Sequence, residues 1–233
     1  MTRLLVHVEG QTDEAFVNQV LAPHLECRGF SQVSARLMGN ARQRARRGGI
    51  TGWPSARSDI LRHLREDRGC IATIMVDYYG LPQRGGEAWP QRARATLRPF
   101  PEKAGSIERA LLEDIARNMG AGFNKHRFVP YLAMHEFEAL LFSNCERFGD
   151  GIGHPNLIPK LQKIRHAFVS PEEINDSPKS APSKRIQALV VDYQKPLHGT
   201  IAAMSIGIHC IRAECPHFCD WLARLEQSLP SSR

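Results

Sequence analysis

Residues 3–16, RLLVHVEGQTDEAF, join an apolar run to a glutamate, a glycine and the start of a helix. The run from Leu4 to Val8 is apolar enough for a strand that is buried on both faces, as in parallel sheets. After the glycine, Thr12 can cap a helix and Asp13 suits its positive first turn. Glu9 is therefore predicted to lie at the carboxyl end of a first strand, where open α/β sheets place ligands and chemistry.

A second apolar run ends on an acid in the same way. The stretch from Cys70 to Val76 is apolar and partly β-branched, and Asp77 follows it directly. Parallel strands present their carboxyl ends at one edge of a sheet, so we expect Glu9 and Asp77 to lie close together. Two converging carboxylates repel each other unless a cation lies between them, and this favours a divalent metal.

Residues 134–142, MHEFEALLF, supply candidates for a third acid. On a helix, Glu138 would lie nearer the apolar face than Glu136, so only one of the two would reach a shared site. The alternative is that both are simply acids near the start of a helix. The sequence leaves these two interpretations open.

The order of apolar patterns predicts an α/β fold with a mostly parallel sheet flanked by helices. Further strand-like runs are predicted at 32–37 and 128–132. Helical spacing is found at 16–25, at 54–67 and, after a cap at Ser106, at 107–115. Beyond Asn144 the candidate elements are helices at 158–168, 183–191, 200–213 and 218–229. We therefore expect an α/β core over residues 1–143 and a helical C-terminal portion over residues 144–233 that packs on it.

The net charge of +7 comes largely from arginine, whose guanidinium group matches phosphate. Two loop segments, 40–52 and 78–103, concentrate the arginines, and the second also holds Tyr78, Tyr79 and Trp89, a mixture that suits base stacking and phosphate contact. Each segment could equally be a solvated or structural loop. The candidate nucleic-acid contacts are Arg42, Arg44, Arg46, Arg47, Arg84, Arg92 and Arg94.

The sequence also bears on location in the cell. It has no apolar run near the roughly 20 residues that a membrane span needs, and Glu9 comes too early for a signal peptide. The six cysteines are scattered without the framework of a secreted protein, so we expect reduced thiols. These features predict a cytoplasmic protein with no membrane association.

Several segments resemble a known family. A strand, a glutamate, a glycine and a helix opening on T-D-E resemble the first motif of the TOPRIM fold, which topoisomerases, primases and overcoming-lysogenization-defect (OLD) type nucleases share. More specifically, the chain resembles a family of uncharacterised bacterial TOPRIM-like proteins. Five segments carry this resemblance, in this order: VEGQTDEAFV, VDYYGLP, HEFEALLFS, APSKRI and IRAECPHFCDWLARLE. Members of that family serve as the nuclease partner of an ABC-type ATPase in anti-phage defence. The resemblance covers nearly the whole chain.

The resemblance implies a TOPRIM-like core in which Glu9 is the catalytic glutamate and Asp77 opens the acidic pair that binds magnesium. TOPRIM domains usually carry D-x-D, whereas this chain has D-Y-Y. Either Glu136 or Glu138 would then take the place of the missing second acid, or metal binding would be weaker.

Together these observations predict a nuclease that cleaves phosphodiester bonds, with Glu9 and Asp77 as catalytic residues. Mg²⁺ or Mn²⁺ would be held by Glu9 and Asp77 with help from Glu136 or Glu138. DNA and RNA, including tRNA, are both candidate substrates, and an ABC-type ATPase is the expected protein partner. The alternative is a binding or regulatory subunit that docks on the ATPase and has little chemistry of its own. The sequence leaves open whether the chain forms a homo-oligomer.

Overall fold

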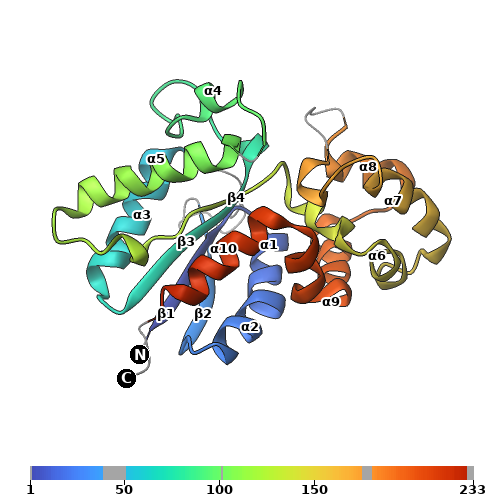
Figure 1. The fold of residues 1–233 in the computed structure, drawn as a ribbon, viewed down its shortest axis with the longest axis horizontal. Coiled ribbons are helices and arrows are strands. Elements are labelled where there is room, and N and C mark those ends of the chain that lie inside the picture. The colour runs from blue at the N-terminus through green and yellow to red at the C-terminus, as the bar shows by residue number, and fades with distance from the viewer. Residues whose placement is uncertain (1, 39–50, 101, 175–179, 230–233) are drawn as a thin grey trace.

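The computed structural model describes residues 2–38, 51–100, 102–174 and 180–229, and its centre is a parallel β-sheet (Figure 1). In these residues the sheet has four strands in the order β2-β1-β3-β4, and all neighbouring strands are parallel. The strands are β1 (Arg3–Val8), β2 (Gln32–Leu37), β3 (Cys70–Asp77) and β4 (Tyr131–Ala133). The predicted α/β class and parallel sheet are confirmed.

The register of the sheet brings the ends of β1 and β3 to nearly the same level. Val8 pairs with Met75, so Glu9 lies one position and Asp77 two positions beyond that pair. Asp77 in turn pairs with Ala133 at the end of β4. Both predicted acids are therefore at the carboxyl edge of the sheet.

The first helical segment begins one residue earlier than the predicted cap. It consists of α1 (Gln11–Phe16), a π-helical turn η1 (Val17–Leu21) and α2 (Ala22–Cys27). Gly10 is the N-cap residue, and the Asp13 carboxylate accepts a hydrogen bond from the Gly10 backbone N–H at 3.0 Å. The prediction that Thr12 caps this helix is wrong, because Thr12 already lies inside the first turn.

Helices cover both faces of the sheet (Figure 1). One face packs against α3 (Trp53–Glu66) and α5 (Glu102–Met119), and the other against α1, α2 and α10 (Pro216–Gln227). Side chains of β3 alternate between the two cores: Ile71 and Met75 face one, and Ala72, Ile74 and Val76 face the other. Ser106 is not the cap of α5 as predicted; it lies inside the helix, and its hydroxyl donates to the Lys103 carbonyl.

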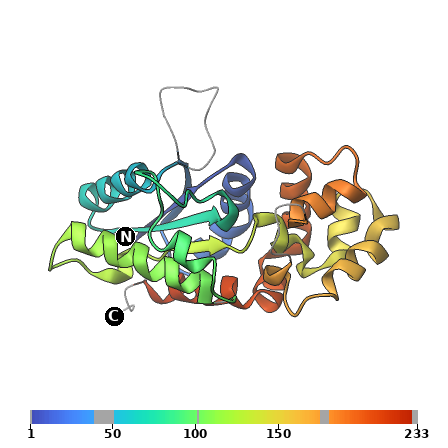
Figure 2. The same ribbon diagram turned by 90° about the horizontal axis from the view of Figure 1, so that it is seen from above.

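Beyond the carboxyl ends of the strands lies a helical lobe (Figures 1 and 2). It is built from α6 (Cys145–Gly151), α7 (Ile158–Arg165), α8 (Pro182–Leu189) and the first part of α9 (Lys195–Glu214). The four helices predicted beyond Asn144 are confirmed as α7, α8, α9 and α10, and α6 is an addition to them. Gly207, at a φ of 76°, bends α9. Short elements complete the chain: η3 (Tyr78–Gly80), α4 (Arg92–Ala95), η4 (Lys125–Arg127), η5 (Phe137–Ser143), η6 (Pro155–Leu157) and η7 (Pro171–Glu173).

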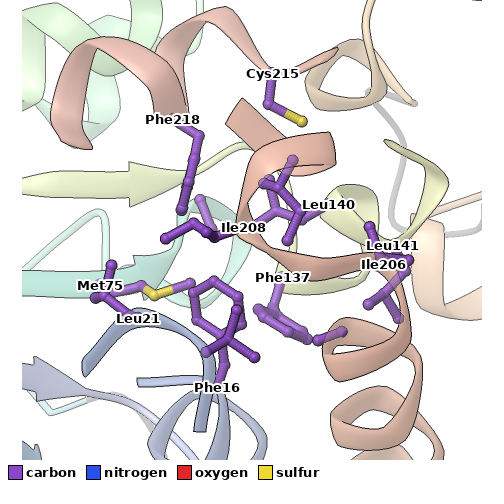
Figure 3. Close-up of a cluster of buried hydrophobic side chains, with 14 of the residues drawn as sticks. Phe16, Leu21, Met75, Phe137, Leu140, Leu141, Ile206, Ile208, Cys215 and Phe218 are labelled. Carbon is purple, nitrogen blue, oxygen red and sulfur yellow. The ribbon is translucent and has the colours of Figure 1, made fainter. Parts of the chain in front are cut away.

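One hydrophobic cluster joins the sheet to the C-terminal helices (Figure 3). In it Phe16 of α1 lies 5.3 Å from Phe137 of η5 and 6.1 Å from Phe218 of α10, measured between ring centroids. Met75 of β3 and Ile208 of α9 belong to the same cluster. The predicted boundary near residue 144 therefore does not divide the hydrophobic core. Within the described ranges, no helix has the length and apolar character that crossing a membrane requires.

Candidate functional site

Acidic side chains from several elements gather at the carboxyl edge of the sheet. Glu9 follows β1, Asp77 ends β3, and the segment after β4 carries Glu136 and Glu138. One oxygen of Asp77 accepts a hydrogen bond from the Phe137 backbone N–H at 2.8 Å. This bond ties the end of β3 to the start of η5, so it fixes the two glutamates relative to the strand end.

Glu9 is partly exposed, but one of its carboxylate oxygens, Oε2, is buried and has no hydrogen-bond partner among the described residues. Burial raises the pKa of Glu9 above its ordinary value, and the charges of Glu136 and Glu138 raise it further. The Asp77 backbone and the Lys195 ammonium act in the opposite direction. A buried carboxylate oxygen without a donor is ready to accept a proton, a water or a cation.

Asp13 also belongs to this site, although the sequence predicted for it only a place in the first turn of a helix. Its side chain is only 7% exposed. Burial, followed by the charge of Glu9, raises the pKa of Asp13 to about 7. The sequence holds a signal for this position of Asp13. An acid three residues after a helix cap folds back toward that cap. Here the cap is Gly10, which directly follows Glu9, so the Asp13 side chain is brought near Glu9.

The pKa of Asp77 is also raised by burial and by neighbouring negative charges. Burial raises its pKa well above the ordinary value, and Asp13, Glu9 and Glu138 add to the effect. A carboxylate that is surrounded by other carboxylates in a dry site holds a proton unless a cation replaces it.

Glu136 and Glu138 have different partners. Glu136 is the N-cap of η5 and Glu138 lies in it, and η5 is a 3-10 helix rather than the α-helix on which their predicted positions depended. The charges of both glutamates raise the pKa of Glu9. Glu138 is 2% exposed, and its Oε1 lies 3.0 Å from the Nζ atom of Lys195. Glu136 is partly exposed, and its Oε2 accepts a hydrogen bond from the Ser183 backbone N–H at 2.9 Å, in the first turn of α8.

Lys195 is the cation of this acidic site. It is the first residue of α9, and its side chain is 40% exposed. Burial lowers its pKa, but Glu138, Glu136 and Asp77 outweigh burial and raise the pKa above its ordinary value. Lys195 was not predicted as a site residue, because no local sequence pattern connects it with acids that precede it by more than fifty residues.

The donor chemistry of the site fits a hard divalent cation, because every acidic ligand offers carboxylate oxygen. However, in the described part of the chain no group of three or more His, Cys, Asp or Glu side chains is arranged to hold a metal ion. Mg²⁺ is usually bound by one or two carboxylates, with waters and substrate phosphates as the other ligands. Glu9, with its unpartnered Oε2, and Asp77 fit that kind of site.

The predicted nucleic-acid contacts have different fates. Arg42, Arg44, Arg46 and Arg47 lie outside the described residues. Arg84 and Arg94 are exposed. Arg92 is only 3% exposed and lies inside the protein, where it donates hydrogen bonds to the Tyr78 carbonyl and hydroxyl and covers the Tyr78 ring at 3.7 Å. Arg92 therefore supports the fold and is not a surface contact for phosphate.

The aromatic residues of the same segment are also largely internal. Tyr78 and Trp89 are each 2% exposed, and the Trp89 indole N–H donates to the Thr51 carbonyl at 2.9 Å. Tyr79 is partly buried and stacks on the His135 ring, with the ring centroids 5.3 Å apart. The expectation that Tyr78 and Trp89 stack on bases is wrong, because both side chains complete the core.

Fold and site together define an α/β protein with an acidic site at the carboxyl edge of a parallel sheet. The sequence profile of the family DUF4276, a domain of unknown function, matches residues 8–226, and the chain belongs to this family. No curated protein and no solved structure matches the chain significantly.

Proposed function

We propose that this protein is a metal-dependent nuclease that cleaves phosphodiester bonds in nucleic acid, with RNA such as tRNA among its candidate substrates. The observation that carries the proposal is the gathering of Glu9, Asp13 and Asp77 in a desolvated site whose charge is partly offset by the Lys195 ammonium. The resemblance to TOPRIM-like nucleases and the net charge of +7 support it.

Glu9 and Asp77 are the proposed ligands of Mg²⁺ or Mn²⁺. Such a cation, when bound, neutralises charge on the scissile phosphate and lowers the pKa of a bound water. Asp13 is the candidate for the second acid that D-Y-Y lacks, because its charge acts on both Glu9 and Asp77. Glu138, already paired with Lys195, is better suited to holding that lysine in place.

The remaining residues have roles in binding and proton transfer. The pKa of Glu9 is raised in the direction of neutral pH. A general base works best when its pKa is near the working pH, so Glu9 suits the role of taking a proton from an attacking water. The half-exposed ammonium of Lys195 and the exposed guanidinium groups of Arg84 and Arg94 would contact phosphate oxygens. These contacts position the backbone of the nucleic acid without reading its sequence.

A cleavage assay tests the proposal. Plasmid, single-stranded DNA and tRNA are incubated with the protein and with Mg²⁺ or Mn²⁺, and Glu9→Gln and Asp77→Asn are compared with Glu102→Gln, which changes an exposed acid on α5. We expect each site variant to lose at least about a hundredfold in rate, and the control to lose less than about twofold. Cleavage that persists in both site variants would refute the assignment of the site.

The second candidate function is a binding or regulatory subunit of an ATPase. It is favoured by one observation, that no group of three or more metal-ligating side chains is preformed among the described residues. Calorimetry separates the two functions. The role as a binding or regulatory subunit is supported if the protein binds an ABC-type ATPase tightly but does not bind Mg²⁺ or Mn²⁺ at millimolar concentration. On the resemblance alone, we extend the proposal to a cytoplasmic effector of ATPase-linked anti-phage defence.

A further inference from the structure

A cavity of about 480 Å³ lies away from the acidic site, next to the edge strand β4. It is lined by residues of α5, of the segment that leads into β4 and of α10. Part of its lining is apolar and comes from Leu112, Val129 and Pro130. Ligand cavities in proteins typically have this size and combine an apolar lining with a few polar groups.

Three cationic side chains line the same cavity: Arg109, Lys125 and Arg224. Arg109 and Lys125 are exposed, and neither side chain makes a hydrogen bond or an ion pair with any described residue. By contrast, Arg57 and Arg165 each lie within hydrogen-bond distance of a carboxylate. Arg109 and Lys125 thus bring positive charge to the cavity that the described residues do not pair.

Among the described residues that line the cavity, the acid is Glu108, which offsets the charge of Arg224 and leaves Arg109 and Lys125 unpaired. Glu108 is 4% exposed, and both of its carboxylate oxygens are already used. Its Oε1 accepts from the Leu132 backbone N–H at 3.0 Å and lies 2.8 Å from the His217 Nε2 atom, and its Oε2 lies 3.3 Å from Arg224. Glu108 therefore holds Arg224 at the cavity, while the guanidinium group keeps further donors for a ligand.

We propose that this cavity binds a small amphipathic organic anion. Its carboxylate or phosphate group would be bound by Arg109, Lys125 and Arg224, and its apolar body would lie against Leu112 and the Val129–Pro130 wall. The apolar lining supplies contact area, and the unpaired cations supply the preference for an anion. A divalent cation, which the acidic site would attract, would be repelled here. The inference does not depend on the proposed nuclease activity.

An amphipathic fluorescent anion, 8-anilinonaphthalene-1-sulfonate, probes the cavity in the intact protein. We expect saturable fluorescence with one site per chain, and weaker binding at higher ionic strength. The double variant Arg109→Ala/Lys125→Ala is expected to bind about tenfold more weakly, and it should fold normally because both side chains are exposed and unpaired. Arg62→Ala, an exposed arginine on α3, serves as the charge control and should change affinity less than about twofold.

A second control addresses adventitious binding of the dye to exposed apolar surface. Leu197 and Met204 on α9 are 52% and 53% exposed, and the variant Leu197→Ser/Met204→Ser removes that surface. Binding that survives this change but weakens in Arg109→Ala/Lys125→Ala supports the cavity. The proposal is overturned if the dye shows no saturable binding, or if only the α9 variant reduces it.

Competition then identifies the anionic group. Benzoate and phenyl phosphate carry the same ring and differ in the anionic group. The compound that displaces the dye at the lower concentration shows whether the cavity prefers a carboxylate or a phosphate. Inorganic phosphate, which lacks an apolar body, should compete more weakly than phenyl phosphate. Equal competition by inorganic phosphate and phenyl phosphate contradicts the amphipathic part of the proposal.

Discussion

The ammonium group of Lys195 lies 3.0 Å from the carboxylate of Glu138, and this carboxylate is only 2% exposed. The two residues come from opposite ends of the site: Glu138 from the segment after β4, and Lys195 from the first turn of α9. The pair therefore fixes the start of α9 against the carboxyl edge of the sheet.

Replacing the lysine should destabilise the protein. In Lys195→Met the buried Glu138 carboxylate loses its counter-ion, which is costly, although the 40% exposure of Lys195 means that solvent screens part of the interaction. We expect the free energy of unfolding in urea at neutral pH to fall by about 1–2 kcal/mol. The double variant Lys195→Met/Glu138→Gln should recover most of it, and an unchanged stability of the single variant would contradict a role for the pair.

Asp13 should limit stability at neutral and higher pH. Its pKa is raised from 3.8 to about 7, so its contribution is fully present below pH 3.8 and is lost as the pH rises through 7. We therefore expect Asp13→Asn to be more stable than the natural chain at pH 8, by about 2–4 kcal/mol, with a smaller difference at pH 5. Denaturant titrations at both pH values measure this, with Glu102→Gln as the control. A variant that is less stable at pH 8 would show that the carboxylate is needed for the Gly10 contact.

Binding of a divalent cation should release protons. The pKa values of Glu9, Asp13 and Asp77 are all raised, that of Asp13 to about 7, so a cation that binds here must displace the proton that Asp13 still holds in part near neutral pH. Calorimetry of Mg²⁺ or Mn²⁺ binding in buffers of different ionisation enthalpy measures the number released. We expect release near pH 6.5, less release near pH 8.5, and a smaller value in Asp13→Asn. Binding without any dependence on the buffer would count against a shared site.

His7 should make the protein sensitive to acid. It is 2% exposed, its Nδ1–H donates to the Thr73 carbonyl at 3.2 Å, and its Nε2 lies 3.0 Å from the His63 Nδ1 atom. Burial, reinforced by His63, lowers the pKa of His7 from 6.5 to about 4. The stability that neutral His7 provides is present above pH 6.5 and is lost as the pH falls toward 4.

The variant His7→Gln tests this sensitivity. Its free energy of unfolding should fall less between pH 6.5 and pH 4 than that of the natural chain, with a difference of about 2–3 kcal/mol. Because the acids of the candidate site titrate in both proteins, the difference between the two curves reports on His7 together with its neighbour His63. Parallel curves would show that the imidazole does not titrate in this range.

The positions of Glu9 and Asp77 could be predicted because they depend on local sequence. Each follows a short apolar run of the length and composition typical of a buried strand, and parallel strands place their carboxyl ends together. Lys195 could not be predicted in this way, because its place beside Glu138 depends on how the helical lobe packs against the sheet. Tertiary packing leaves no periodic signal in the sequence.

The segment from Tyr78 to Arg94 shows a different limit. Arginines among aromatic residues form the same pattern whether they cover a nucleic acid or one another. Here the Arg92 guanidinium lies on the Tyr78 ring inside the protein, and Trp89 packs against Trp53. The solvent exposure of the arginine and aromatic side chains decides between nucleic-acid binding and packing inside the protein. That exposure depends on the folded structure and cannot be read from the order of the residues.

The hydrophobic cluster that joins Phe16, Phe137 and Phe218 has a consequence for how the chain unfolds. The sheet and the C-terminal helices cannot lose this cluster separately, so denaturation should be a single cooperative transition rather than two. A fragment that stops at residue 143 would leave the sheet face that α10 covers open to water. Such a fragment should aggregate, so the acidic site would not be obtained in folded form by truncation at residue 143.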